Sequence, residues 1–143
     1  MGAVLSWLGG YDAAEGSSSG PVAAADGSSS VQAFHSSERW QLHFNELKKS
    51  STLMVIDFSA TWCGPCKAME PIFNALSAKF TDVDFVKIDV DELSDVAQEF
   101  GVQAMPTFVF VKKGKEVDRI VGGKKDDLEK KIEKHRAIRN GSL

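Results

Sequence analysis

The sequence predicts an α/β domain with a central mixed β-sheet that has helices on both faces. Two short, mainly apolar runs, at 52–59 and 83–89, have the pattern of strands that are covered on both sides. Segments with helical spacing of apolar residues alternate with these strands, and a β-hairpin and a final helix follow. Because strands and helices alternate before the hairpin, the sheet must combine parallel and antiparallel pairs.

The first 30 residues are predicted to be a flexible extension, and residues 31–143 are predicted to be one domain. Residues 9–30 consist mostly of Gly, Ser, Ala and acidic residues. Such a segment has too little apolar surface to offset the entropy that ordering would cost. The remaining residues are numerous enough to bury a core of their own.

Charge is unevenly distributed along the chain. Residues 1–36 contain three acidic residues and no Lys or Arg, whereas residues 37–143 hold equal numbers of acidic and basic residues. A neutral domain with an acidic tail has no electrostatic attraction for nucleic acid. No apolar run approaches the roughly 18 residues of a membrane span, and the N-terminus resembles neither a secretory signal nor a transit peptide. We therefore expect a cytoplasmic protein that does not bind nucleic acid.

The first two strong elements are a helix over 37–49 and a strand over 52–59. Ser36 and Ser37 are suitable N-cap residues for the helix. The large apolar side chains that follow recur at helical spacing and are assigned to the core, namely Trp40, Phe44 and Leu47. The strand contains one charged residue, Asp57, and leads into a helix over 63–80. Pro71 lies inside that helix and is expected to kink it.

Glycines separate the remaining elements. Gly101 ends a short helix, and Gly114 lies between two apolar runs that are expected to pair as a hairpin. In order, the predicted elements are a strand at 83–89, a helix at 94–100, strands at 107–111 and 116–121, and a helix at 126–139.

The chain has only two cysteines, Cys63 and Cys66, and both lie at the start of the predicted helix 63–80. Two thiols without a secretion signal indicate redox or metal chemistry in a reducing compartment. The free N–H groups of a helix N-terminus stabilise a thiolate at Cys63. Cys66 lies one turn further, within disulfide reach, and is expected to be more enclosed. We therefore expect Cys63 to attack a target disulfide and Cys66 to resolve the mixed disulfide.

Gly64 and Pro65 lie between the cysteines and carry no cationic side chain, which favours a reducing pair over an oxidising one. Two other interpretations remain open. A zinc site needs about four ligands, and besides its two thiols the chain offers only scattered histidines, His35, His43 and His135. Two inert core cysteines would not need Gly-Pro between them at a helix start.

The segment Asp57-Phe58-Ser59-Ala60-Thr61-Trp62-Cys63-Gly64-Pro65-Cys66-Lys67 resembles the active-site segment of thioredoxins. The similarity covers residues 37–139 and includes Pro71, 87–89, 105–107 and 122–123. The Ser-Ala-Thr-Trp lead-in and the Gly/Ser-rich extension are similar to plant h-type thioredoxins with N-terminal extensions. The resemblance implies a thioredoxin fold and a thiol-disulfide oxidoreductase that reduces protein disulfides in cell redox homeostasis.

The resemblance also implies partners. These are target proteins with disulfides and a thioredoxin reductase that supplies electrons from NADPH, with glutathione as the alternative source; no cofactor would be bound. We expect a monomer and no metal. A binding or chaperone-like module on the same fold is the main alternative function. An oxidase or isomerase is disfavoured by Gly64-Pro65 and by the missing secretion signal.

Asp57 is a carboxylate within an otherwise apolar strand. Burial would raise its pKa and make it a proton acceptor for Cys66, whereas an Asp at a strand end in contact with water is the alternative. The resemblance implies the first role, and it matches Lys87 to the family's lysine near that Asp. By residue type alone, Lys87 would be a solvated lysine at a strand end.

Pro106 begins a predicted strand, where its missing N–H group is tolerated. The resemblance implies a cis Met105–Pro106 peptide bond beside the cysteine pair, with a backbone that pairs with a bound substrate strand. It also implies an apolar patch around the exposed sulfur, formed by Trp62, Gly64, Pro65, Met105, Val121, Gly122 and Gly123.

Gly2 and Ser6 meet the minimal pattern for N-myristoylation of Gly2. One myristoyl chain gives only marginal membrane binding, and this region has neither a cysteine for a second lipid nor a basic cluster. We therefore expect weak, reversible membrane association of a largely cytosolic protein.

Overall fold

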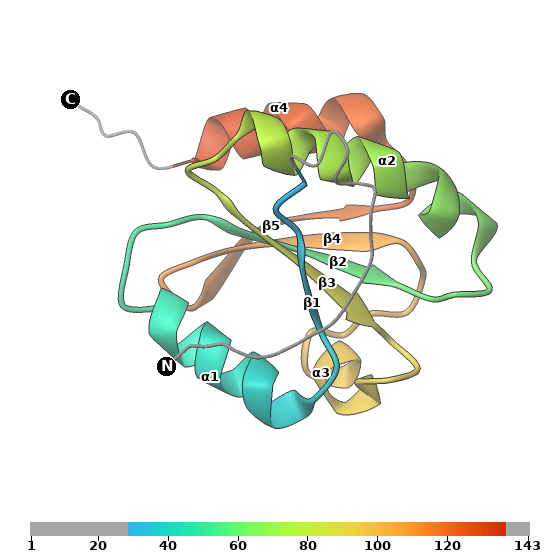
Figure 1. The fold of residues 1–143 in the computed structure, drawn as a ribbon, viewed down its shortest axis with the longest axis horizontal. Helices are drawn as coiled ribbons and strands as arrows, with labels where there is room; N and C mark the ends of the chain where they lie inside the picture. Colours follow the sequence, from blue (N-terminus) through green and yellow to red (C-terminus); the bar gives the residue numbers. More distant parts are fainter. Residues whose placement is uncertain (1–28, 137–143) are drawn as a thin grey trace.

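The computed structural model describes residues 29–136, in which five strands and four helices follow one another (Figure 1). The elements match the predicted order, with one strand added at the N-terminal end. In chain order they are β1 (Gln32–Phe34), α1 (Ser37–Leu47), β2 (Met54–Ser59), α2 (Gly64–Lys79), β3 (Asp84–Asp89), α3 (Ser94–Glu99), β4 (Thr107–Lys112), β5 (Lys115–Val121) and α4 (Lys125–His135).

The strands form one sheet in the order β1-β3-β2-β4-β5, so β2 lies at its centre. β2 pairs in parallel with β3 and antiparallel with β4, which confirms the mixed sheet. Parallel neighbours need a crossover connection, and α2 supplies it between β2 and β3. The continuous apolar run of β2 follows from this position, because all six of its residues are buried.

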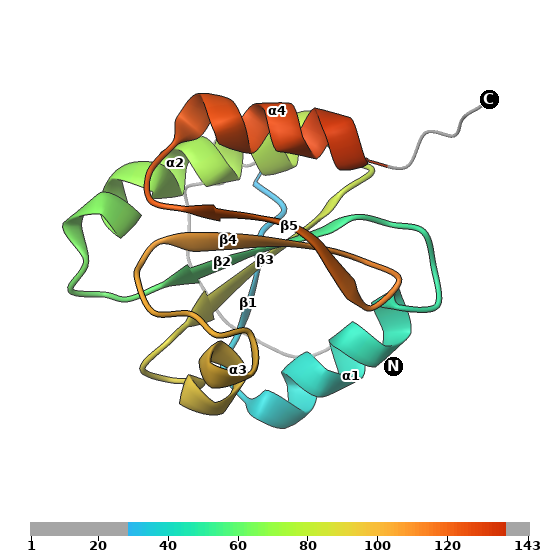
Figure 2. The same cartoon turned by 180° about the vertical axis from the view of Figure 1, so that it is seen from behind.

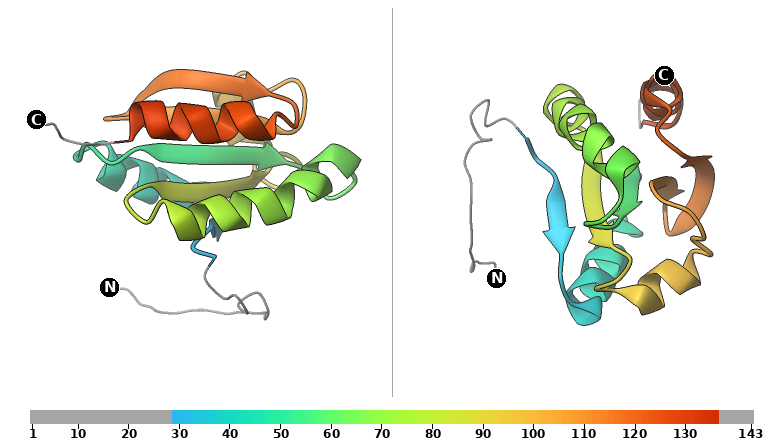
Figure 3. Two further views of the ribbon diagram at one scale, coloured as in Figure 1. Left: turned by 90° about the horizontal axis from the view of Figure 1, so that it is seen from above. Right: turned by 90° about the vertical axis from the view of Figure 1, so that its right-hand side faces the viewer.

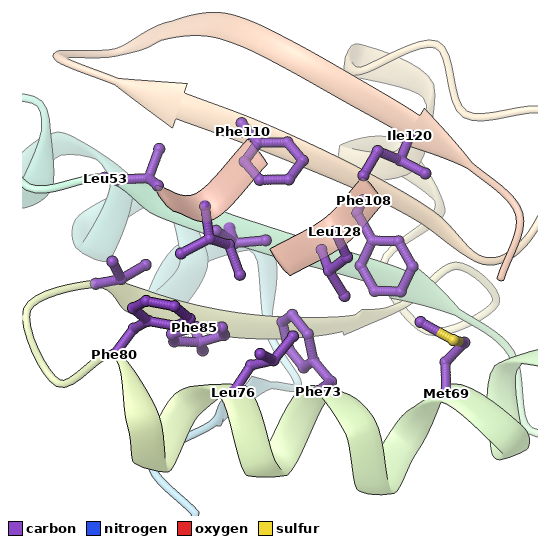
Figure 4. Close-up of a cluster of buried hydrophobic side chains, with 13 residues drawn as sticks. Leu53, Met69, Phe73, Leu76, Phe80, Phe85, Phe108, Phe110, Ile120 and Leu128 are labelled. Atoms are coloured by element: carbon purple, nitrogen blue, oxygen red, sulfur yellow. The ribbon is translucent and has the colours of Figure 1, made fainter. Parts of the chain in front are cut away.

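Two helices cover each face of the sheet. α2 and α4 lie together on one face, and α1 and α3 lie on the other (Figures 2 and 3). Successive side chains of β2 point to opposite faces, so Val55 packs toward α2 and α4 while Ile56 packs toward α1 and α3. Figure 4 shows the first of these cores, in which Phe73 of α2 meets aromatic side chains from β3 and β4.

Local sequence signals account for the beginning of α1 and for the β4–β5 hairpin. The Ser36 hydroxyl accepts the N–H of Arg39 at 3.1 Å, so Ser36 is the N-cap of α1. In the hairpin, Lys113 and Gly114 both have positive φ, at 53° and 79°. Two such residues make the turn whose twist suits antiparallel strands. A side chain at Gly114 would also crowd Lys48, because a Cβ added to Gly114 would lie 3.1 Å from the Cβ of Lys48.

The structure differs from the sequence prediction at both ends of the domain. β1 was not predicted, because a three-residue edge strand is too short to show a periodic pattern. α4 ends at His135 rather than at residue 139. Arg136 is extended, and its guanidinium donates to both oxygens of Asp82, while Lys112 donates to the His135 carbonyl that the helix leaves free. These contacts end the helix early.

Residues 1–28 of the predicted extension lie outside the described residues. The chain joins the domain at Ser29 and Ser30, which hydrogen-bond to Asn74 and Ser77 of α2. Between residues 29 and 136, no helix is both long and apolar enough to cross a membrane.

Leu128 tests how much of the stability comes from the core beneath α2 and α4, because its side chain is fully buried there. Leu128→Ala should lower the free energy of unfolding by about 2–5 kcal/mol, since it removes buried apolar contacts and leaves a cavity. The measurement is urea unfolding of the disulfide form. Leu42→Ala is the matched control because Leu42 is 71% exposed, and it should change stability by less than about 0.5 kcal/mol. Equal losses in both variants would contradict this account of the core.

Candidate active site

The two cysteines form a disulfide at the N-terminus of α2, with their Cα atoms 5.3 Å apart. Cys63 is the N-cap residue, and its sulfur accepts the backbone N–H of Cys66 at 3.2 Å. A helix N-terminus offers free N–H groups and positive dipole character. The same geometry would stabilise a thiolate on Cys63 once the disulfide is reduced.

The expectation that Cys66 is more enclosed than Cys63 is wrong for this disulfide form. The two residues are 6% and 5% exposed, because the first turn of α2 folds both sulfurs against Ala60. The two cysteines differ instead in the part of the protein surface that lies next to each of them. The Cys63 sulfur lies 3.7 Å from the carbonyl oxygen of Met105, whereas Cys66 lines a groove on another side of the helix start.

Strand register brings three distant segments to the cysteines. Phe58 of β2 pairs with Thr107 of β4, and Thr107 pairs with Val121 of β5. The segments just beyond these residues therefore lie at one end of the sheet, on the right in Figure 1. They contain the cysteines, the Met105–Pro106 bond and the glycines that follow β5. This arrangement depends on β4 running antiparallel to both of its neighbours.

The Met105–Pro106 peptide bond is cis, as the resemblance implied. The carbonyl oxygen of Pro106 accepts the N–H of Gly122 at 2.8 Å, which fixes the turn after β5 beside the proline. Gly122 has φ of +103°, a backbone conformation that side chains disfavour. Gly123 approaches α2 closely: a Cβ added to Gly123 would lie 3.4 Å from the side chain of Met69 in that helix.

Exposed apolar groups surround this end of the sheet. Trp62 is 67% exposed and Val121 is 48% exposed, and Met105 is half-buried near them in the chain segments just described. The indole N–H of Trp62 donates to a carboxylate oxygen of Asp91 at 2.9 Å. Asp91 was not singled out from the sequence, because it is far from Trp62 in the chain and exposed acids in loops are common.

Asp57 is the one buried carboxylate of β2, with 3% of its surface exposed. It shares a face of the sheet with Val55, beneath α2, where Cys66 and Met69 belong to the buried stripe of the helix. Among the described residues, no group hydrogen-bonds its Oδ1 atom. Burial raises the pKa of Asp57 to about 7, while Lys87 lowers the pKa and Glu70 raises it. The alternative of a water-exposed Asp at a strand end is excluded.

Lys87 lies beside Asp57 on the neighbouring strand, in direct register with it. Its ammonium nevertheless donates to Glu70 of α2 at 2.7 Å. The side chain of Lys87 is 35% exposed, so it is neither the fully solvated lysine of the simplest interpretation nor a direct partner of Asp57. Glu70 was missed from the sequence, although its position four residues after Cys66 puts both on one side of a helix.

A groove of about 340 Å³ borders Cys66. Its walls come from the end of β1, the segment after β2, the first turns of α2 and the adjacent part of β3. Lys87 and Glu70 lie on its wall together with Cys66, and a His35–Glu92 pair closes another side. The groove gives solvent a route to the second cysteine.

The histidines have other partners than a metal in this fold. His35 pairs with Glu92, His43 with Asp84 and His135 with Asp118. Within residues 29–136, no group of three or more His, Cys, Asp or Glu residues is arranged to hold a metal ion.

Comparison with known proteins agrees with this geometry. Residues 33–134 match the Thioredoxin family model. The chain is 63% identical over 123 residues to Thioredoxin H2 of Arabidopsis thaliana, an alignment that covers 83% of this chain and 92% of that protein. It is 55% identical over 102 residues to an H-type thioredoxin of Picea mariana, covering 71% of this chain and 82% of the relative.

Solved structures give the same result. The crystal structure of the thioredoxin NaTrxh from Nicotiana alata superposes with a TM-score of 0.77 at 71% identity, covering 85% of this chain and all of that one. A wild-type poplar thioredoxin h superposes with a TM-score of 0.69 at 39% identity, covering 73% and 94% of the two chains. The chain therefore belongs to the thioredoxin family, and with a cysteine pair at the active-site position it is a thiol-disulfide oxidoreductase that reduces protein disulfides.

Proposed function

We propose that Cys63 is the attacking residue of the reductase and Cys66 the resolving residue. The observation that carries this assignment is the position of the Cys63 sulfur, which accepts a helix N-terminal N–H and faces the Met105 carbonyl at the apolar patch. The Cys63 thiolate attacks one sulfur of a target disulfide, forms a mixed disulfide and releases the other target sulfur as a thiolate. Cys66 then attacks the Cys63 sulfur, so the Cys63–Cys66 disulfide forms and the second target thiolate leaves.

Asp57 is the proposed proton acceptor for Cys66 in the second step. A thiol must lose its proton before it attacks, and a base with a pKa near 7 both accepts that proton and returns it to solvent near neutral pH. Its position beneath the first turns of α2 supports this role.

The apolar patch is the proposed substrate surface. Trp62, Met105, Pro106, Gly122 and Gly123 would contact an extended target segment, whose backbone pairs with the chain just before Pro106. Support comes from the exposure of Trp62 and from the hydrogen bond that joins Gly122 to Pro106. A patch with few directional groups suits many targets, because apolar contact does not depend on one side-chain pattern.

Gly64 and Pro65 would tune the pair toward reduction, since they add no positive charge beside the Cys63 sulfur. The electrons would come from NADPH through a thioredoxin reductase, with no cofactor bound to this chain. We further propose that the protein works as a monomer in the cytoplasm.

Residues 1–30 are proposed to act as an extension separate from the domain of residues 31–143. Myristoylation of Gly2 would give it weak, reversible membrane association. The support is the sequence pattern alone, because Gly2 lies outside the described residues.

Serine variants of the cysteines test the division of roles. With insulin as substrate and NADPH plus thioredoxin reductase as electron source, Cys63→Ser should reduce insulin no faster than a reaction without the protein, because it lacks the attacking thiolate. Cys66→Ser should instead accumulate mixed disulfides that mass spectrometry locates at Cys63. Wild-type turnover in Cys63→Ser would refute the assignment.

Asp57→Asn tests the proton acceptor without changing the shape of the side chain. Mixing the reduced protein with dithiobis(nitrobenzoate) releases one coloured thiolate on attack by Cys63 and a second on resolution by Cys66. At pH 7 the second release should slow by at least about tenfold, because the general base is lost. An unchanged second phase would remove Asp57 from the mechanism.

The same variant should also alter how stability depends on pH. Because the folded pKa of about 7 lies above the ordinary aspartate pKa of 3.8, folded Asp57 keeps its proton to higher pH than unfolded Asp57 does. The wild type therefore loses stability as pH rises from about 4 to about 7. Asp57→Asn should become increasingly more stable than wild type over this range, by about 4 kcal/mol at pH 8. Urea unfolding of the disulfide forms at pH 4 and pH 8 measures this. A difference that does not vary with pH would contradict the buried carboxyl.

Gly2→Ala tests the proposed lipid, because it removes the acylated residue and changes nothing else in the chain. In cells that myristoylate the wild-type protein, the membrane-bound fraction should fall to the level of a variant that lacks residues 1–8. Equal membrane fractions for wild type and Gly2→Ala would remove this proposal.

A further inference from the structure

Lys87 lies between two carboxylates that compete for its charge. It pairs in register with Asp57 across the β2–β3 ladder, so their side chains leave the same face of the sheet. Its ammonium instead donates to Glu70 at 2.7 Å, and Asp57 Oδ1 is left without a hydrogen-bond donor among the described residues. The Lys87 ammonium therefore pairs with the exposed carboxylate of Glu70 and not with the buried carboxyl of Asp57.

The charged groups around Asp57 are few. β3 presents Lys87, and α2 presents Glu70 together with Cys66. β4 places Phe108 opposite Asp57, and α4 contributes only the apolar side chains of Leu128 and Ile132 to this core. The position of a single ammonium group therefore decides whether Asp57 behaves as a buried isolated acid or as half of an ion pair.

We propose that Glu70 is a positioning residue for Asp57: by holding the Lys87 ammonium at the groove, it keeps Asp57 unpaired and therefore basic enough to take the Cys66 proton. The inference rests on the proposed role of Asp57. A carboxylate that is paired with an ammonium group ionises at lower pH and is a weaker base. Glu70 prevents that pairing because its helix position holds it over Lys87, on the wall that both share with Cys66.

An ion pair with only a structural role would behave differently. The side chains of Lys87 and Glu70 are 35% and 51% exposed, and pairs this accessible contribute little to stability. At pH 4, where folded Asp57 keeps its proton in both proteins, Glu70→Gln should therefore leave urea unfolding nearly unchanged, while it changes the titration of Asp57. A shifted Asp57 midpoint with unchanged stability indicates the positioning role, whereas a loss of stability with an unchanged midpoint indicates a structural role only.

The direct experiment is a titration of the Asp57 carboxyl in the full chain. Aspartate labelled with carbon-13 at the carboxyl group gives one resonance for each residue, and Asp57→Asn identifies the resonance of Asp57. In Glu70→Gln the released Lys87 can turn to Asp57, so the titration midpoint should fall by about one pH unit. The pH profile of the second thiolate release should shift in the same direction and by a similar amount.

Glu129→Gln is the matched control. Glu129 of α4 also pairs with a lysine of α2, Lys79, but that pair lies at the other end of the helix from the cysteines. Its loss should leave the Asp57 midpoint where it is in wild type. An equal fall in both variants would mean that net charge, and not the position of Lys87, sets the midpoint.

The double variant Lys87→Met/Glu70→Gln decides whether Glu70 acts through Lys87. Without the ammonium, Glu70→Gln should shift the Asp57 midpoint by less than half of what it does in the wild-type background. A full shift there, or an unchanged or raised midpoint in Glu70→Gln alone, would overturn the proposal. If Asp57→Asn resolves at the wild-type rate, the proposed function fails instead, and the titration still reports whether Glu70 positions Lys87.

Discussion

The active site depends on one constraint, the burial of β2 on both faces while it carries a carboxyl group. The strand lies at the centre of the sheet between two layers of helices, so Asp57 has almost no contact with bulk water. An isolated charge is unfavourable there, so the Asp57 carboxyl keeps its proton up to near-neutral pH. The same strand ends a few residues before Cys63, so this buried carboxyl, the proposed base, lies beneath the start of α2. The proposed base is therefore also a residue that lowers the stability of the fold as pH rises.

The two cysteines share one helix turn but meet different surroundings. Cys63 faces the Met105 carbonyl and the exposed patch with Trp62, where a large target can approach. Cys66 faces a groove of about 340 Å³ whose lining includes the Lys87–Glu70 and His35–Glu92 pairs. Because both residues are equally buried in the disulfide form, their proposed roles rest on what lies next to each sulfur and not on how deeply each is buried. In the proposed mechanism, target proteins approach the side of Cys63, and the proton of Cys66 leaves on the other side of the pair.

Much of this could be predicted from the sequence, because the decisive signals are local. The apolar run with Asp57, the start of a helix at Cys63 and the glycine of the β4–β5 turn each involve a few adjacent residues. The contacts of Glu70 with Lys87 and of Asp91 with Trp62 could not be predicted from the sequence, since they join residues that only the fold brings together. β1 was too short for its pattern to be seen, and α4 ends where Asp82 and Lys112 hold the chain.

The proposed division of roles requires that the start of α2 activates Cys63 and not Cys66. Alkylation of the fully reduced protein with a limiting amount of iodoacetamide at pH 7 tests it, because only thiolates react and peptide mass spectrometry locates the product. Cys63 should be modified first, with a rate that rises at lower pH than the rate of an ordinary thiol, whose pKa is about 8.5. Preferential modification of Cys66, or equal modification of both cysteines, would contradict it.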